Sequence, residues 1–187
     1  MRRLLFALPF ALLPLAAAHA AHDEHEHHDE HASLAAHEHG AAQLNVALEG
    51  QRLELALESP AMNLVGFEHA AVSSTDKTAV AHARQHLQTP LALFGIAAAA
   101  GCVITSQELH SPLFEAHAEE HAEHGAEHSD IDANYVLTCS HPQALAAIDL
   151  SELFKRFPAT DKIQVQLIGP NGQQGAELSA AQPRLSF

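Results

Sequence analysis

The sequence of 187 residues predicts an α+β protein, with an antiparallel β-sheet, two or three short helices, one disulfide and flexible His-rich segments. Several stretches alternate apolar and polar residues, which is typical of strands with one buried face. Two other stretches repeat apolar residues at helical spacing. The two cysteines lie in separate strand-like stretches, where they can pair. These features together indicate one folded domain with appended segments.

The first 20 residues have the features of a secretory signal peptide. Arg2 and Arg3 provide a positive start, an apolar stretch follows, and Ala20 is the expected cleavage point. The apolar stretch is shorter than the ~20 residues that span a bilayer, and Pro9 and Pro14 interrupt it. We therefore expect an exported protein without a membrane anchor, located in a bacterial periplasm.

The rest of the chain divides by composition into a tract and a domain. Residues 21–40 form a His-rich acidic tract with almost no large apolar residues, so we expect disorder there until metal binds. Residues 41–187 are expected to form a single α+β domain with a His-rich insertion at 110–131. Removing Arg2 and Arg3 from the 9 basic residues leaves 7 against 23 acidic ones, a net charge of −16 with neutral histidines. This charge excludes nucleic acid and anionic lipid as partners and favours cations.

The domain is expected to begin with a β-hairpin. Apolar residues occupy every second position in 44–48 and again in 53–57, and residues 49–51 form a short turn between the two strands. Residues 59–70 contain Pro and Gly and are predicted to form a packed loop.

A helix of about three turns is predicted within residues 76–90. Its apolar residues have helical spacing, Asp76 is a suitable N-cap, and Pro90 lies beyond its end. Residues 91–101 allow two interpretations. Their alanines favour a helix, whereas the neighbouring glycines and the following strand favour an extended or irregular run.

Two β-rich runs, 102–109 and 132–139, lie on either side of the insertion. If they pair antiparallel, Cys102 and Cys139 come close together, and an oxidising compartment permits a disulfide. Such a bond would stabilise the fold by roughly 3–4 kcal/mol in the chain-entropy model. The alternative is that the two isolated cysteines belong to a metal or catalytic site.

The last part of the chain predicts one more helix and a group of terminal strands. A short helix is expected at 150–158, where Pro158 stops it. Strands are expected at 162–169, 175–179 and 183–187, with a turn at the sequence GPNG after the first of them.

Histidines are concentrated in two acidic segments, because twelve of the seventeen lie in residues 21–40 and 110–130. Neutral imidazole is the commonest side-chain ligand of borderline divalent metals, and Asp and Glu add oxygen ligands and a negative field. The alternative is a low-complexity acidic spacer. Such tracts predict several exchangeable divalent ions but do not by themselves select Zn²⁺, because Cu²⁺ and Ni²⁺ would also bind in vitro. The expected ligands in the first segment are His22, His25, His27, His28, His31, His37 and His39.

The second segment has a helical pattern of its own. If residues 112–128 are helical, four histidines lie within an arc of about 60° and can chelate an ion from neighbouring turns. Gly125 weakens such a helix, so metal binding would be what orders it. The four expected ligands are His117, His121, His124 and His128.

A site held by the folded domain is expected where His37 and His39 precede the first strand. His69, which follows Glu68, would meet them if its loop packs near the start of that strand. The alternative is that His69 forms only a local hydrogen bond within its loop.

His82 and His86 lie one turn apart on the predicted helix, within the sequence HARQH. This sequence lacks the glutamate of the HExxH protease signature, so hydrolysis is not expected. No nucleophile elbow or phosphate-binding glycine loop is present either, and we expect the protein not to be an enzyme. A solvent-facing pair is the favoured interpretation, and an auxiliary metal site is the alternative.

Five stretches between residue 37 and the C-terminus carry a resemblance to a known family. They are HEHGAAQLNVALEGQRLELALESPAMNLVGFEHA, AAAAGCVITSQEL, ANYVLTCS, LFKRFP and VQLIGPNGQQGAELSAAQPRLSF, with the His-rich insertion between the second and third. The chain resembles the ZrgA-type family, the zinc-regulated periplasmic zinc-binding proteins of Gram-negative bacteria. The resemblance implies a zinc-binding accessory protein that supports zinc acquisition with a zinc ABC importer. The alternatives are a periplasmic buffer or storage protein for excess Zn, Cu or Ni, and a protein-interaction module with incidental metal binding.

Overall fold

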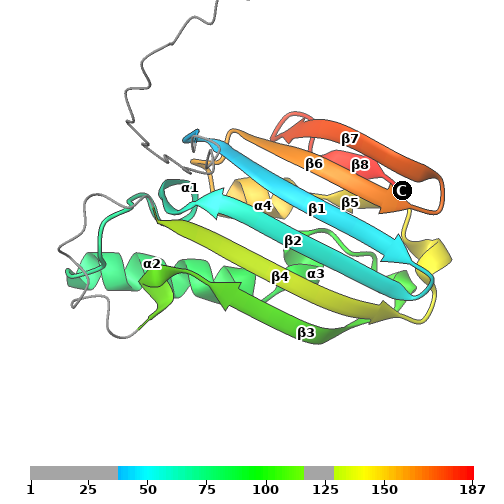
Figure 1. Ribbon diagram of the computed structural model, residues 1–187, viewed down its shortest axis with the longest axis horizontal. Helices are drawn as coiled ribbons and strands as arrows, with labels where there is room; N and C mark the ends of the chain where they lie inside the picture. The colour runs from blue at the N-terminus through cyan, green and yellow to red at the C-terminus, as the bar shows by residue number, and fades with distance from the viewer. Residues whose placement is uncertain (1–37, 116–128) are drawn as a thin grey trace, which may run out of the picture. The chain divides into compact units, whose positions relative to one another are not determined.

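A six-stranded β-sheet is the framework of the computed structural model, which describes residues 38–115 and 129–187. The strand order is β3-β4-β2-β1-β6-β7, and β5 pairs with β8 in a second sheet. Figure 1 shows the helices behind the large sheet, so one face is covered and the other is open. The strands are β1 (Ala41–Glu49), β2 (Arg52–Pro60), β3 (Cys102–His110), β4 (Asp130–Cys139), β5 (Ala147–Asp149), β6 (Lys162–Gly169), β7 (Gly172–Ser179) and β8 (Arg184–Ser186). The helices are α1 (Ala61–Val65), α2 (Ser74–Leu87), α3 (Pro90–Leu93) and α4 (Ser151–Arg156), and 3-10 turns occur at Ala98–Ala100, Pro112–Phe114 and Pro142–Ala144.

The predicted N-terminal hairpin is confirmed. β1 and β2 pair antiparallel, with Leu44 opposite Leu57 and Val46 opposite Leu55. All four side chains are buried, while the residues between them point to the open face. The alternation of apolar and polar residues therefore correctly predicted both the two strands and the face of each that packs on the core.

The sheet is mixed, because β1 and β6 pair in parallel, with Leu44 opposite Val165. The other strand pairs of the large sheet are antiparallel, and the α+β class is confirmed. The prediction of an antiparallel sheet missed this one pair. Alternation of apolar and polar residues indicates which face of a strand is buried, but not whether the neighbouring strand runs parallel or antiparallel. The sequence pattern therefore could not predict the parallel pair.

Helix α2 buries Val80, Ala83 and Leu87, in agreement with the predicted helical spacing. Its N-cap is Ser73, however, and Asp76 is the third helical residue of a capping box rather than the cap itself. The two Ser73–Asp76 hydrogen bonds satisfy backbone N–H groups at both ends of the first turn, and so the helix starts earlier than predicted. Across 38–115 and 129–187, no helix combines the length and apolar character needed to span a membrane.

Two segments differ from the sequence-based prediction. The predicted loop at 59–70 begins with the end of β2 and then forms the short helix α1, which Gly66 ends with φ of 88°. The segment at 91–101, for which the sequence allowed two interpretations, contains most of α3 and a 3-10 turn. Gly95, with φ of 59°, separates the two. Both short helices are stabilised mainly by packing, since Leu64, Leu93 and Phe94 are buried.

The terminal elements agree with the prediction in position. Helix α4 lies within the expected range, and β6 and β7 form the antiparallel hairpin across the GPNG turn. The last strand, β8, pairs with β5 and not with the large sheet. The sequence analysis did not anticipate β5, since a run of three residues is too short to show alternation.

The disulfide is confirmed between Cys102 and Cys139, which lie directly opposite each other at one end of the β3–β4 pair. The other end of this pair, where β3 ends at His110 and β4 begins at Asp130, is joined by residues 111–129 of the His-rich insertion. Cys139 is fully buried. The bond therefore fixes the register of the two strands that carry the insertion.

Replacing both cysteines by alanine should lower the free energy of unfolding by roughly 3 kcal/mol, because the bond closes a loop with a sequence separation of 37. Urea unfolding of the oxidised wild type and of the double variant measures this difference. Reduced wild type is the control and should match the variant. A difference below about 1 kcal/mol would show that strand pairing alone fixes this hairpin.

Candidate metal site

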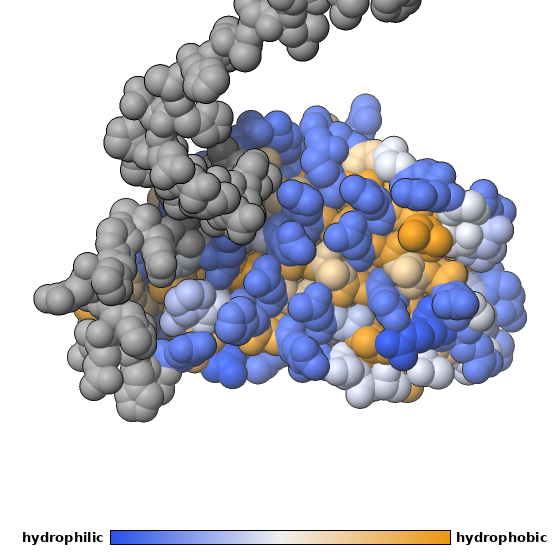
Figure 2. Space-filling model, viewed as in Figure 1, coloured by the Kyte–Doolittle hydropathy of each residue, from blue (hydrophilic) through white to orange (hydrophobic). Residues whose placement is uncertain are grey.

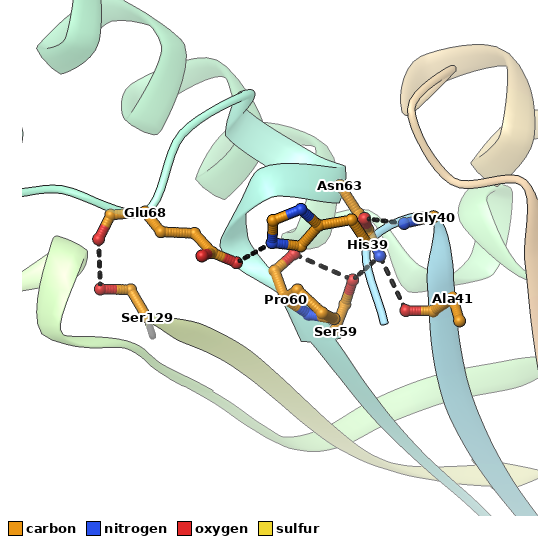
Figure 3. A network of polar contacts seen from close by, with 8 residues as sticks. All are labelled: His39, Gly40, Ala41, Ser59, Pro60, Asn63, Glu68 and Ser129. Carbon is orange, nitrogen blue, oxygen red and sulfur yellow. Dashed lines mark hydrogen bonds and ion pairs between the residues drawn. The ribbon is translucent and has the colours of Figure 1, made fainter. Parts of the chain in front are cut away.

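The two His-rich segments join the domain at the same end of the large sheet. The first segment ends where β1 begins, and the insertion at 110–131 ends in the first residues of β4. The segment that follows β2 contacts Ser129, the residue before β4: the Ala61 N–H donates to the Ser129 carbonyl at 2.8 Å, and Ser129 Oγ donates to the Glu68 carbonyl at 3.0 Å. Figure 3 shows the Ser129–Glu68 hydrogen bond together with the neighbouring contacts of His39 and Asn63.

Asn63 is the anchor of this network. The side chain is 2% exposed, and its Oδ1 accepts from the Gly40 N–H at 2.7 Å. Its Nδ2 donates to the Ala41 carbonyl at 2.8 Å and to Ser59 Oγ at 3.2 Å. One amide thereby ties helix α1 to the first residues of β1. A buried amide with both ends satisfied holds the backbone in one arrangement.

His39 faces Glu68 across this junction, with His39 Nε2 3.0 Å from Glu68 Oε1. The His39 side chain is 51% exposed and that of Glu68 is 16% exposed. When Nε2 carries the proton and donates to the carboxylate, the lone pair of Nδ1 is available for a metal. A carboxylate that orients an imidazole in this way is a common arrangement around protein-bound zinc.

His69 is exposed beside this pair. Its Nδ1 donates to the Ala70 carbonyl at 2.9 Å, and its ring stacks on Phe67 with the centroids 4.7 Å apart. This is the local hydrogen bond of the alternative interpretation. It also fixes the tautomer in which Nε2 has a free lone pair, so the bond does not prevent metal binding.

Within the described ranges, no three His, Cys, Asp or Glu side chains are arranged to hold a metal ion. The structure thus brings His39 into contact with Glu68. His69 is the next residue in sequence after Glu68, and the three do not form a closed metal site. The predicted helix at 112–128 begins with a 3-10 turn at Pro112–Phe114, and its remainder lies outside the described residues. The other ten predicted ligands also lie outside them: His22, His25, His27, His28, His31, His37, His117, His121, His124 and His128.

His82 and His86 do not form a matching pair of ligands. His82 is exposed, but His86 Nδ1 accepts a hydrogen bond of 2.7 Å from Arg156 Nη1, and its ring contacts Phe157 edge-on. An imidazole that accepts at Nδ1 carries its proton on Nε2, and so it has no lone pair left for a metal. His86 therefore joins α2 to α4, a role that its sequence spacing with His82 did not reveal.

Asn63 is the residue of this site that the sequence analysis missed, because a polar residue in a Pro- and Gly-containing stretch is usually exposed. Asn63→Ala should lower the free energy of unfolding by roughly 2–4 kcal/mol, because it leaves the Gly40 N–H and the Ala41 carbonyl without their partner. Chemical denaturation measures the loss. Asn45→Ala on the open face of β1 is the matched control and should change stability by less than about 0.5 kcal/mol.

The His86 contact predicts a dependence of stability on pH. Burial lowers the pKa of His86, and the charges of Arg156 and His82 lower it further. The unfolded chain then binds the proton more readily, so this contribution to stability is complete above about pH 6.5 and is lost as the pH falls through the folded-state pKa. His86→Gln keeps an acceptor for Arg156 but does not titrate. The free energy of unfolding of wild type and of this variant is measured by denaturation from pH 7.5 to 5. Wild type should lose more stability than the variant as the pH falls. A difference between the two that does not change with pH would contradict a lowered pKa of His86.

A comparison with known protein families gives a match to most of the chain. The model of the ZrgA family zinc uptake protein matches residues 36–187, which is most of the chain. No curated protein matches it. The family and the disulfide together indicate an extracytoplasmic protein with a zinc-related role. The chain belongs to the ZrgA family of zinc uptake proteins.

Proposed function

We propose that this protein is a non-enzymatic periplasmic accessory protein that collects Zn²⁺ through its two His-rich segments for uptake. The observation that carries the proposal is the shared junction, where His39, Glu68 and Ser129 bring the ends of both segments to one side of the domain. Ions bound by either segment are then held around the same place. Membership of a zinc uptake family supports zinc as the metal.

The charge of the chain favours cation capture. Acidic residues outnumber basic ones by 23 to 9, and many of them alternate with the histidines in residues 21–40 and 116–128. A negative field raises the local concentration of divalent cations and speeds their association. The imidazoles then supply the selectivity for zinc over hard cations such as Mg²⁺.

His39 and His69 are candidate zinc ligands that the folded domain holds in place. The hydrogen bonds of both rings leave one nitrogen free, on Nδ1 of His39 and on Nε2 of His69, so either can bind an ion that a neighbouring segment also contacts. Sites with fewer than four protein ligands keep an open position for exchange. An acquisition protein needs such exchange, because a closed four-ligand site would retain its ion.

Delivery requires a partner, for which we propose a periplasmic component of a zinc ABC importer. Residues 1–20 would direct export and be removed, and export brings the histidines to the compartment in which such an importer loads. The disulfide agrees with folding in an oxidising environment.

Replacing ten histidines by Gln should abolish most zinc binding while the domain stays folded. The ten positions are 22, 25, 27, 28, 31, 37, 117, 121, 124 and 128. Isothermal titration of the chain from residue 21 onward with Zn²⁺ at neutral pH should give more than one ion for wild type and a large loss for the variant. Circular dichroism of the variant checks the fold.

Replacing His82, His86 and His141 by Gln in an otherwise intact chain is the matched control, since none of these residues lies at the junction. Its zinc stoichiometry should equal that of wild type. A ten-site variant with unchanged stoichiometry would contradict the proposed function.

A further inference from the structure

We draw no further inference here: the strongest candidate, the shallow hollow on the open face of the large sheet (Figure 2), which Ala47, Ala56, Glu54 and Glu108 help to line, belongs to an unpartnered sheet face, and nothing in the structure shows what covers it.

Discussion

The pairing of β4 with both β2 and β3 is the interaction on which the rest of the structure depends. β4 is the strand to which the chain returns after the His-rich insertion, and its Tyr135 and Leu137 lie fully in the core. Closing a long segment costs entropy that grows slowly with its length, so a long insertion is tolerated if its two ends are well fixed. The disulfide fixes one end of the β3–β4 pair, and the bonds of Ser129 to Ala61 and Glu68 fix the other.

The parts of the fold that the sequence predicted are those with a local signal. Alternation in 44–48 and 53–57 gave the hairpin and its buried face, and helical spacing gave α2. The disulfide followed from two strand predictions that supported each other. The parallel β1–β6 pair and the β5–β8 pair could not be predicted in this way, because they depend on which distant strands meet and in which direction, and hydrophobic periodicity contains neither fact.

The same distinction applies to the candidate site. The approach of His39 to the segment around Glu68 was expected, since one precedes the first strand and the other follows the second, so antiparallel pairing returns the chain to it. Asn63 and the His86–Arg156 bond were not. Their roles depend on burial and on a contact between residues 70 positions apart, which residue spacing cannot indicate. Residue type and spacing therefore did not indicate the residues that hold the junction in place, and the predicted ligands remain a prediction.

Apolar side chains pack the core of the described residues, unlike small zinc domains, which unfold without their ion. Leu44, Leu55, Tyr135 and Leu167 pack the covered face of the sheet, and a disulfide adds a covalent constraint. Metal binding and folding are then separate equilibria, so an ion bound at an exposed histidine can leave without loss of the fold. Release on demand is a requirement for passing zinc to another protein. A stable sheet with His39 and His69 exposed at the junction would suit the proposed function, because binding free energy is not spent on folding.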